Sequence, residues 1–200
     1  MTKSYSFIAN DLSLDFVNTV GNISSEVPRE DLNSPSDLIE WSKQGGLISS
    51  KEAGVLSAKT RSDATGSERI YRRALRLRKS IYEVFRTIAD GSPIPSDDLS
   101  VINKELSTAM SKAELFERKG ELVWDWQDNH LERILYLIAR DAADLLTSPP
   151  LAKLRCCSGK TCGWLFLDTS KNNRRQWCDM SDCGNLAKAR RFRERKAHSG

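Results

Sequence analysis

The sequence predicts a mainly helical domain that contains one small β-hairpin, followed by a compact C-terminal module made of a hairpin and a helix. Three observations support this fold class. Apolar residues recur at steps of three and four in the first 150 residues, as in helices that bury one face. Two adjacent prolines, Pro149 and Pro150, interrupt that pattern, and all five cysteines lie beyond them. We therefore expect one domain over residues 1–150 and a smaller one over residues 151–200.

The clearest helix is predicted over residues 67–90, where the apolar spacing is regular and Gly91 acts as a terminator. A shorter helix is expected after Ser34, whose hydroxyl can cap it, with Pro35 at its first position. The long helix also carries a basic face, which we interpret as solvated because that is its usual role. This face consists of Arg72, Arg73, Arg76 and Lys79.

Ser96 is expected to cap the next helix, which extends to about residue 110. The apolar period then changes, and residues 115–117 and 121–126 predict a small hairpin closed at Lys119 and Gly120. Asp128 or Asn129 is expected to cap the last helix of the domain. Its predicted buried stripe consists of Leu131, Ile134, Leu135, Ile138, Ala142 and Leu145.

Charge is distributed unevenly along the chain. Residues 151–200 carry 12 Lys and Arg against 4 Asp and Glu, a net charge of +8, whereas the whole chain carries only +4. The first 150 residues are therefore mildly acidic. This asymmetry is typical of a polyanion-binding end joined to a domain with another role.

Composition favours a cytoplasmic protein without catalytic activity. The first residues lack an apolar run of signal-peptide length, and no stretch approaches the roughly 18 uncharged apolar residues of a membrane span. His130 and His198 are the only histidines, and neither belongs to a recognisable nucleophile or metal constellation. No glycine-rich phosphate loop is present.

The cysteines form two pairs of equal spacing. Four residues separate Cys157 from Cys162 and Cys178 from Cys183, and fifteen lie between the pairs. Two pairs of thiolates suit a tetrahedral zinc site, and a reducing compartment disfavours disulfides. We expect one structural Zn²⁺ on these four cysteines; inert buried thiols are the alternative. Cys156 is expected to be the spare thiol, although an exchange with its neighbour stays open.

The chain between the cysteine pairs is expected to fold over the metal. Residues 164–168 and 174–178 predict two paired strands, and a helix is expected from residue 182 or 183 to about 196. A turn that carries the first cysteine pair, followed by a hairpin and a helix, resembles a treble-clef zinc finger. Trp164 and Trp177 are assigned to the hairpin core rather than to base stacking.

The last helix carries six cations in nine positions, with Glu194 as the only acid among them. Ala189 and Phe192 are expected to pack inward. So many cations exceed what salt bridges require and favour contact with phosphates, and we therefore predict DNA as the partner. The predicted nucleic-acid contacts are Arg174, Arg175, Asn185, Lys188, Arg190, Arg191, Arg193 and Arg195.

Two alternatives to DNA stay open. The basic helix can bind RNA or the acidic surface of a protein, because cations alone do not specify a base sequence. In either case the chain would be an interaction adaptor rather than a transcription regulator.

Several motifs resemble a known pair of domains. The runs from Cys157 to Ser170 and from Arg174 to Asn185 resemble the CGNR-type zinc finger of bacterial proteins. Residues 14–19, 37–41 and 142–146 resemble the ABATE domain that usually precedes this finger. The resemblance implies a stress-induced transcription regulator in which the two cysteine pairs bind zinc. Leu186 stands where the family typically has arginine, so one guanidinium is missing at the start of the helix.

The resemblance also implies a sensor or regulatory role for the first domain, with a small molecule as its ligand. Asp15, Asn18 and Thr19 are polar residues within an apolar segment and could line a pocket for that ligand. The alternative is that they cap and tie a buried segment, and we favour this second interpretation.

Overall fold

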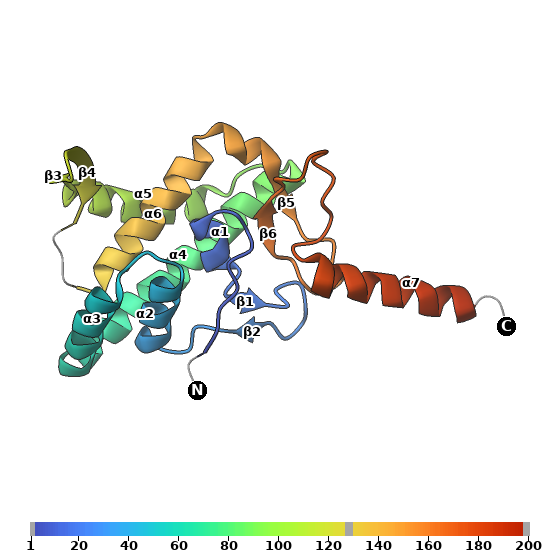
Figure 1. Ribbon diagram of the computed structural model, residues 1–200, viewed down its shortest axis with the longest axis horizontal. Helices are drawn as coiled ribbons and strands as arrows, with labels where there is room; N and C mark the ends of the chain where they lie inside the picture. Colours follow the sequence, from blue (N-terminus) through green and yellow to red (C-terminus); the bar gives the residue numbers. More distant parts are fainter. Residues whose placement is uncertain (1–2, 127–129, 198–200) are drawn as a thin grey trace.

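A computed structural model of the chain describes residues 3–126 and 130–197 and is mainly helical (Figure 1). The caps predicted at Asp128 or Asn129, and His198, lie outside the described residues. In chain order the elements are α1 (Leu12–Val17), β1 (Val20–Gly21), β2 (Arg29–Glu30), α2 (Pro35–Gln44), α3 (Ser50–Ser62), α4 (Ala64–Asp90), α5 (Ser96–Ser111), β3 (Glu114–Arg118), β4 (Glu121–Asp125), α6 (Glu132–Leu146), a 3-10 turn (Pro149–Lys153), β5 (Leu154–Cys156), β6 (Leu165–Leu167), a π-helical turn (Met180–Gly184) and α7 (Asn185–Ala197).

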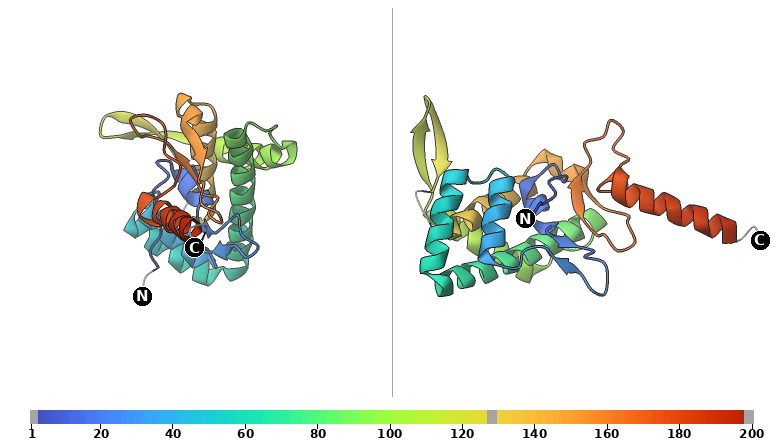
Figure 2. Two further views of the ribbon diagram at one scale, coloured as in Figure 1. Left: turned by 90° about the vertical axis from the view of Figure 1, so that its right-hand side faces the viewer. Right: turned by 60° about the horizontal axis from the view of Figure 1, so that its bottom comes forward.

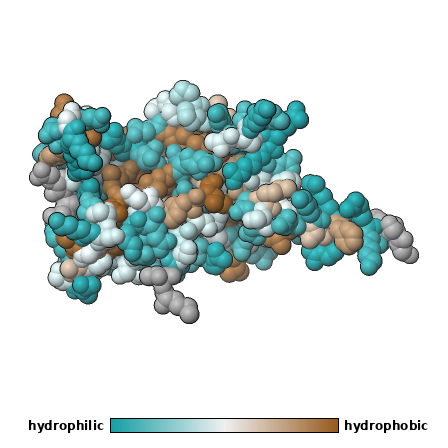
Figure 3. Space-filling view, in the orientation of Figure 1, coloured by the Kyte–Doolittle hydropathy of each residue, from teal (hydrophilic) through white to brown (hydrophobic). Residues whose placement is uncertain are grey.

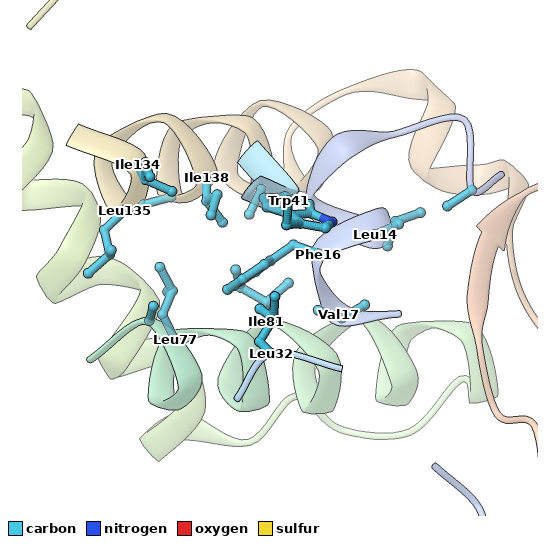
Figure 4. Close-up of a cluster of buried hydrophobic side chains, with 14 of the residues drawn as sticks. Leu14, Phe16, Val17, Leu32, Trp41, Leu77, Ile81, Ile134, Leu135 and Ile138 are labelled. Atoms are coloured by element: carbon cyan, nitrogen blue, oxygen red, sulfur yellow. The ribbon is translucent and has the colours of Figure 1, made fainter. Parts of the chain in front are cut away.

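The main hydrophobic core lies between α1, α2, α4 and α6 (Figure 4). Phe16 of α1 sits at its centre, with its ring centroid 5.1 Å from that of Trp41 in α2. The apolar stripe predicted for α6 is buried, as are the apolar positions of α4 from Ile70 to Phe85. The 3.6-residue period therefore located the faces of both helices correctly.

The helix ends follow the predicted signals with one exception. Ser34 caps α2 by accepting the Asp37 N–H at 3.1 Å, and Gly91 ends α4 with a φ of 69°. Ser96, however, does not cap α5 but is its first residue. The preceding Pro95 occupies the cap position without a side-chain hydrogen bond, and its carbonyl accepts the Leu99 N–H at 3.0 Å. Proline suits this boundary because its own φ is fixed.

The predicted hairpin is present as β3–β4, which projects from the helical body beside α5 (Figure 2). Lys119 and Gly120 form its turn, both with positive φ, 54° and 85°, as a tight two-residue turn requires. A further short pair, β1–β2, lies near the start of the chain. The predicted fold class, mainly helical with small hairpins and a C-terminal hairpin plus helix, is confirmed.

The hairpin of the C-terminal module uses a different partner strand from the one predicted. β6 pairs antiparallel with β5, so that Arg155 lies opposite Phe166, and residues 174–178 form no strand. All three residues of β6 are buried. The buried carboxylate of Asp168 then accepts the N–H groups of Ser170 at 3.0 Å and Arg175 at 2.8 Å. A side chain, rather than a strand ladder, therefore holds the returning segment.

The core does not end at the two prolines. β6 packs against α1 and α4, and its residues belong to the same apolar cluster as Leu14 and Phe16. The Asn18 side chain joins the two regions, donating to the Leu165 carbonyl at 2.8 Å and accepting the Leu165 N–H at 3.0 Å. The domain boundary at residue 150 stays a prediction, and it falls within one continuous core.

Helix α7 projects away from the rest of the molecule (Figures 1 and 2). Ala189 and Phe192 were predicted to pack inward, but both are exposed, Phe192 by 61%. The reason is that no element lies opposite this part of the helix. No helix among the described residues is long and apolar enough to cross a membrane.

Candidate metal centre and nucleic-acid interface

Cys157, Cys162, Cys178 and Cys183 form one cluster, with their four sulfur atoms within 4.8 Å of one another. Cys157 and Cys162 flank the loop after β5, referred to here as the knuckle (residues 157–162). Cys178 precedes the π-helical turn, and Cys183 lies inside it. The turn leads directly into α7, so Cys183 reaches the cluster from just before the helix rather than from its first turn.

The cluster has the dimensions of a tetrahedral thiolate site. Sulfur to sulfur distances are 3.6 Å from Cys162 to Cys178 and 3.8 Å from Cys178 to Cys183. Zinc with four sulfur ligands at about 2.3 Å requires roughly 3.8 Å between them. Backbone N–H groups of Gly159 and Cys178 also point at the Cys157 sulfur, each at 3.4 Å. The donor set therefore fits one structural Zn²⁺.

Hydrogen bonds within the cluster favour a thiolate at its centre. Those from the Cys162 and Cys178 side chains, with the two backbone N–H groups, lower the pKa of Cys157, whereas the neighbouring sulfurs and burial raise the pKa values of Cys162, Cys178 and Cys183. A thiolate is the form that binds a metal ion.

Cys156 lies outside the cluster and contacts a different partner. Its sulfur meets the guanidinium of Arg86 on α4, which also forms an ion pair with Asp90 at 2.7 Å. Burial raises the pKa of the Cys156 thiol. In a strand, successive side chains point to opposite faces, so neighbouring cysteines at the end of β5 cannot share one metal.

The knuckle is tied to the N-terminal domain. Ile23 and Ser24, in the loop between β1 and β2, donate their N–H groups to the carbonyls of Cys162 at 3.0 Å and Thr161 at 3.1 Å. Gly163 packs against the same loop with a φ of 68°, and a side chain there would overlap Ile23 and Ser24. The metal centre is thus fixed against the helical body.

Comparison with known families agrees with this arrangement. Residues 10–149 match the ABATE family, described as "Putative stress-induced transcription regulator". The chain belongs to this family. Residues 153–196 match the CGNR zinc finger, which spans the knuckle and most of α7. A comparison of this ABATE-family chain with curated proteins found no match.

In this ABATE-family protein, α7 presents its cations to solvent. Figure 3 shows the projecting helix as largely hydrophilic, and all its described side chains except the half-buried Ala187 are exposed. Arg190 is 3.5 Å from Glu194, and the Arg191 guanidinium lies 5.9 Å from the ring centroid of Trp177. Leu186, at the position of the motif arginine, is 63% exposed.

The structure gives the remaining predicted nucleic-acid contacts different roles. Arg174 is exposed. Arg175 instead stacks on Phe166 at 4.5 Å and donates to the carbonyls of Trp177, at 2.9 Å, and Cys178. These contacts give Arg175 a structural role, and its contact with nucleic acid stays a prediction. Asn185 begins α7 and donates to the Ser181 carbonyl at 2.9 Å.

Asp15, Asn18 and Thr19 are buried, and their polar atoms are bonded within the protein. Asp15 accepts the N–H groups of Ile8 and Ala9, both at 2.9 Å, and burial raises its pKa to about 6. The Thr19 hydroxyl donates to Phe16 and accepts from Arg78. This geometry favours the interpretation that the three residues tie a buried segment, rather than line a ligand pocket.

Sequence reasoning missed two cations near the metal centre as binding residues. Arg29 of β2 and Lys160 of the knuckle line the same cavity as Arg190 and Arg193 of α7. No pattern in the sequence could have paired Arg29 with the C-terminal helix, because only the folded loop between β1 and β2 brings them together.

Proposed function

We propose that this protein is a transcription regulator that binds DNA through α7, while Cys157, Cys162, Cys178 and Cys183 hold one zinc ion that fixes the helix on the body. One observation carries the proposal: α7 projects into solvent, buries none of its cations and has no apolar face to dock on the body. A helix that is polar on all sides gains little from its own protein. The exposed cations of α7 can instead contact phosphates.

The dimensions of α7 support DNA as the partner. Its 13 residues extend roughly 20 Å, and a single helix of about 10–12 Å diameter fits the major groove, which is about 12 Å wide. Phosphate contacts position such a helix, whereas contacts to base edges would be needed for sequence specificity.

The test removes three cations from one face of α7, with the variant Lys188→Ala, Arg191→Ala, Arg195→Ala. Duplex affinity is measured against salt concentration. Each phosphate contact contributes about 0.9 to the slope of log affinity against log salt, so the slope should flatten by about two to three. Zinc content should not change.

The matched control removes three exposed cations from α4, with Arg72→Ala, Arg76→Ala, Lys79→Ala. This control should bind duplex like the wild type if that face is only solvated. Equal losses in both variants would show non-specific charge attraction and contradict the assignment to α7. Competition by RNA at a lower concentration than duplex would favour the adaptor alternative.

A further inference from the structure

A cavity of about 420 Å³ lies where the N-terminal domain meets the zinc module. The β1–β2 region, the knuckle and the first three turns of α7 provide most of its lining, and residues 6, 8 and 164 and the segment from Cys178 to Cys183 complete it. The hydrogen bonds from Ile23 and Ser24 to the knuckle hold the first two walls together. The cavity is thus built from the fold itself, and its volume lies in the range of small-molecule sites.

Four cations from these three parts face the cavity: Arg29, Lys160, Arg190 and Arg193. Among residues 3–126 and 130–197, the side chains of Lys160 and Arg193 have no hydrogen-bond or ion-pair partner. Arg29 is paired with Asp31 at 3.1 Å, but its side chain is 66% exposed. The side chains of Lys160 and Arg193 therefore keep their full donor capacity for a ligand.

Two acids also line the cavity, Asp179 and Asp182. The Asp179 carboxylate is committed to the π-helical turn, where it accepts the Ser181 N–H and hydroxyl, each at 2.6 Å. Three of the cluster cysteines, Cys162, Cys178 and Cys183, also line the cavity. Because one Zn²⁺ with four thiolates carries a net charge of about −2, the four cations balance the two acids and the metal centre together.

Three apolar side chains also line the cavity: Ile8, Trp164 and Leu186. The Trp164 indole N–H donates to the Val20 carbonyl at 2.8 Å, which fixes the ring and leaves only its apolar surface for a ligand. Leu186 contributes apolar surface at the position where the family motif has arginine. Leu186 and Arg190 are one turn apart on α7, so apolar and basic side chains line the cavity side by side, which suits an organic phosphate.

We propose that this cavity binds a phosphate group together with the organic part attached to it, as in a nucleoside monophosphate. Lys160 and Arg193 would hold the phosphate, since ammonium and guanidinium groups form strong charge-assisted hydrogen bonds with it. The ligand can be a free nucleotide or one nucleotide of a bound strand. A free ligand would neutralise α7 cations and so lower duplex affinity, and this regulatory step rests on the proposed function.

Calorimetric titration of the zinc-loaded full chain with adenosine monophosphate tests the site. The wild type should bind one equivalent. Lys160→Ala, Arg193→Ala should weaken binding at least about tenfold, because each charge-assisted hydrogen bond contributes about that factor. The control Arg76→Ala, Lys79→Ala removes equal charge from the exposed face of α4, outside the cavity, and should bind the nucleotide like the wild type.

Duplex binding provides the second arm and separates the two sources of phosphate. If the free nucleotide fails to bind, but Lys160→Ala flattens the salt slope for duplex by about one, the cavity holds a strand phosphate. If neither measurement changes, the proposal is overturned. A wild type that binds the nucleotide but no duplex would support the cavity while contradicting the proposed DNA binding.

Discussion

Adjacent cysteines at positions 156 and 157 face different surroundings, one the guanidinium of Arg86 and the other the metal cluster. Equal spacing of the pairs was enough to predict which of the two lies in the cluster. Spacing could not predict the contact with Arg86, because that residue lies on α4, 70 positions earlier in the chain. The sequence therefore predicted the metal-binding role of Cys157 but not the long-range contact of Cys156.

Single substitutions distinguish these two environments. Cys178→Ser should lose bound zinc, because three thiolates leave the tetrahedral site incomplete. Cys156→Ser should retain about one zinc per chain. Zinc is measured by atomic absorption after gel filtration. Equal loss in both variants would mean that the ligand assignment is wrong.

Among the elements, helices were predictable and strand partners were not. The buried faces of α4 and α6 follow from a local sequence repeat. β6, in contrast, could pair with either flanking segment, β5 or residues 174–178. Both segments are short. Which of them pairs with β6 depends on the hydrogen bonds of Asp168 and on the packing of β6 against α1 and α4. Likewise, the exposure of Phe192 depends on the absence of a packing neighbour, which local sequence does not encode.

The contact between the β1–β2 loop and the knuckle depends on Gly163. Gly163→Ala should lower the free energy of unfolding by at least about 2 kcal/mol, because a positive φ and overlap with Ile23 and Ser24 both add cost. Gly46→Ala is the control, with a similar φ of 76° and open space around it. Urea unfolding of both variants gives the comparison. Equal destabilisation would show that the loop contact contributes nothing.

On the scale of the whole molecule, the helical body and the zinc module share one core. A chain truncated after Pro149 loses Leu154 and all of β6, and we expect it to be destabilised by more than about 3 kcal/mol. Urea unfolding followed by circular dichroism measures this loss. A chain truncated after Gly184 is the control, since it lacks only the exposed α7 and should unfold like the full chain. An unchanged midpoint for the shorter chain would instead support two independent domains.

The bond between Asn18 and Leu165 joins residues 147 positions apart. During synthesis, α1 emerges long before β6, so it cannot complete its packing until β6 has also left the ribosome. Until then the apolar faces of α1 and α4 lack β6 as a packing partner. Late closure of this kind slows folding and prolongs exposure to aggregation. The newly made chain therefore depends on the segment around β6 not only for metal binding but also for its first stable fold.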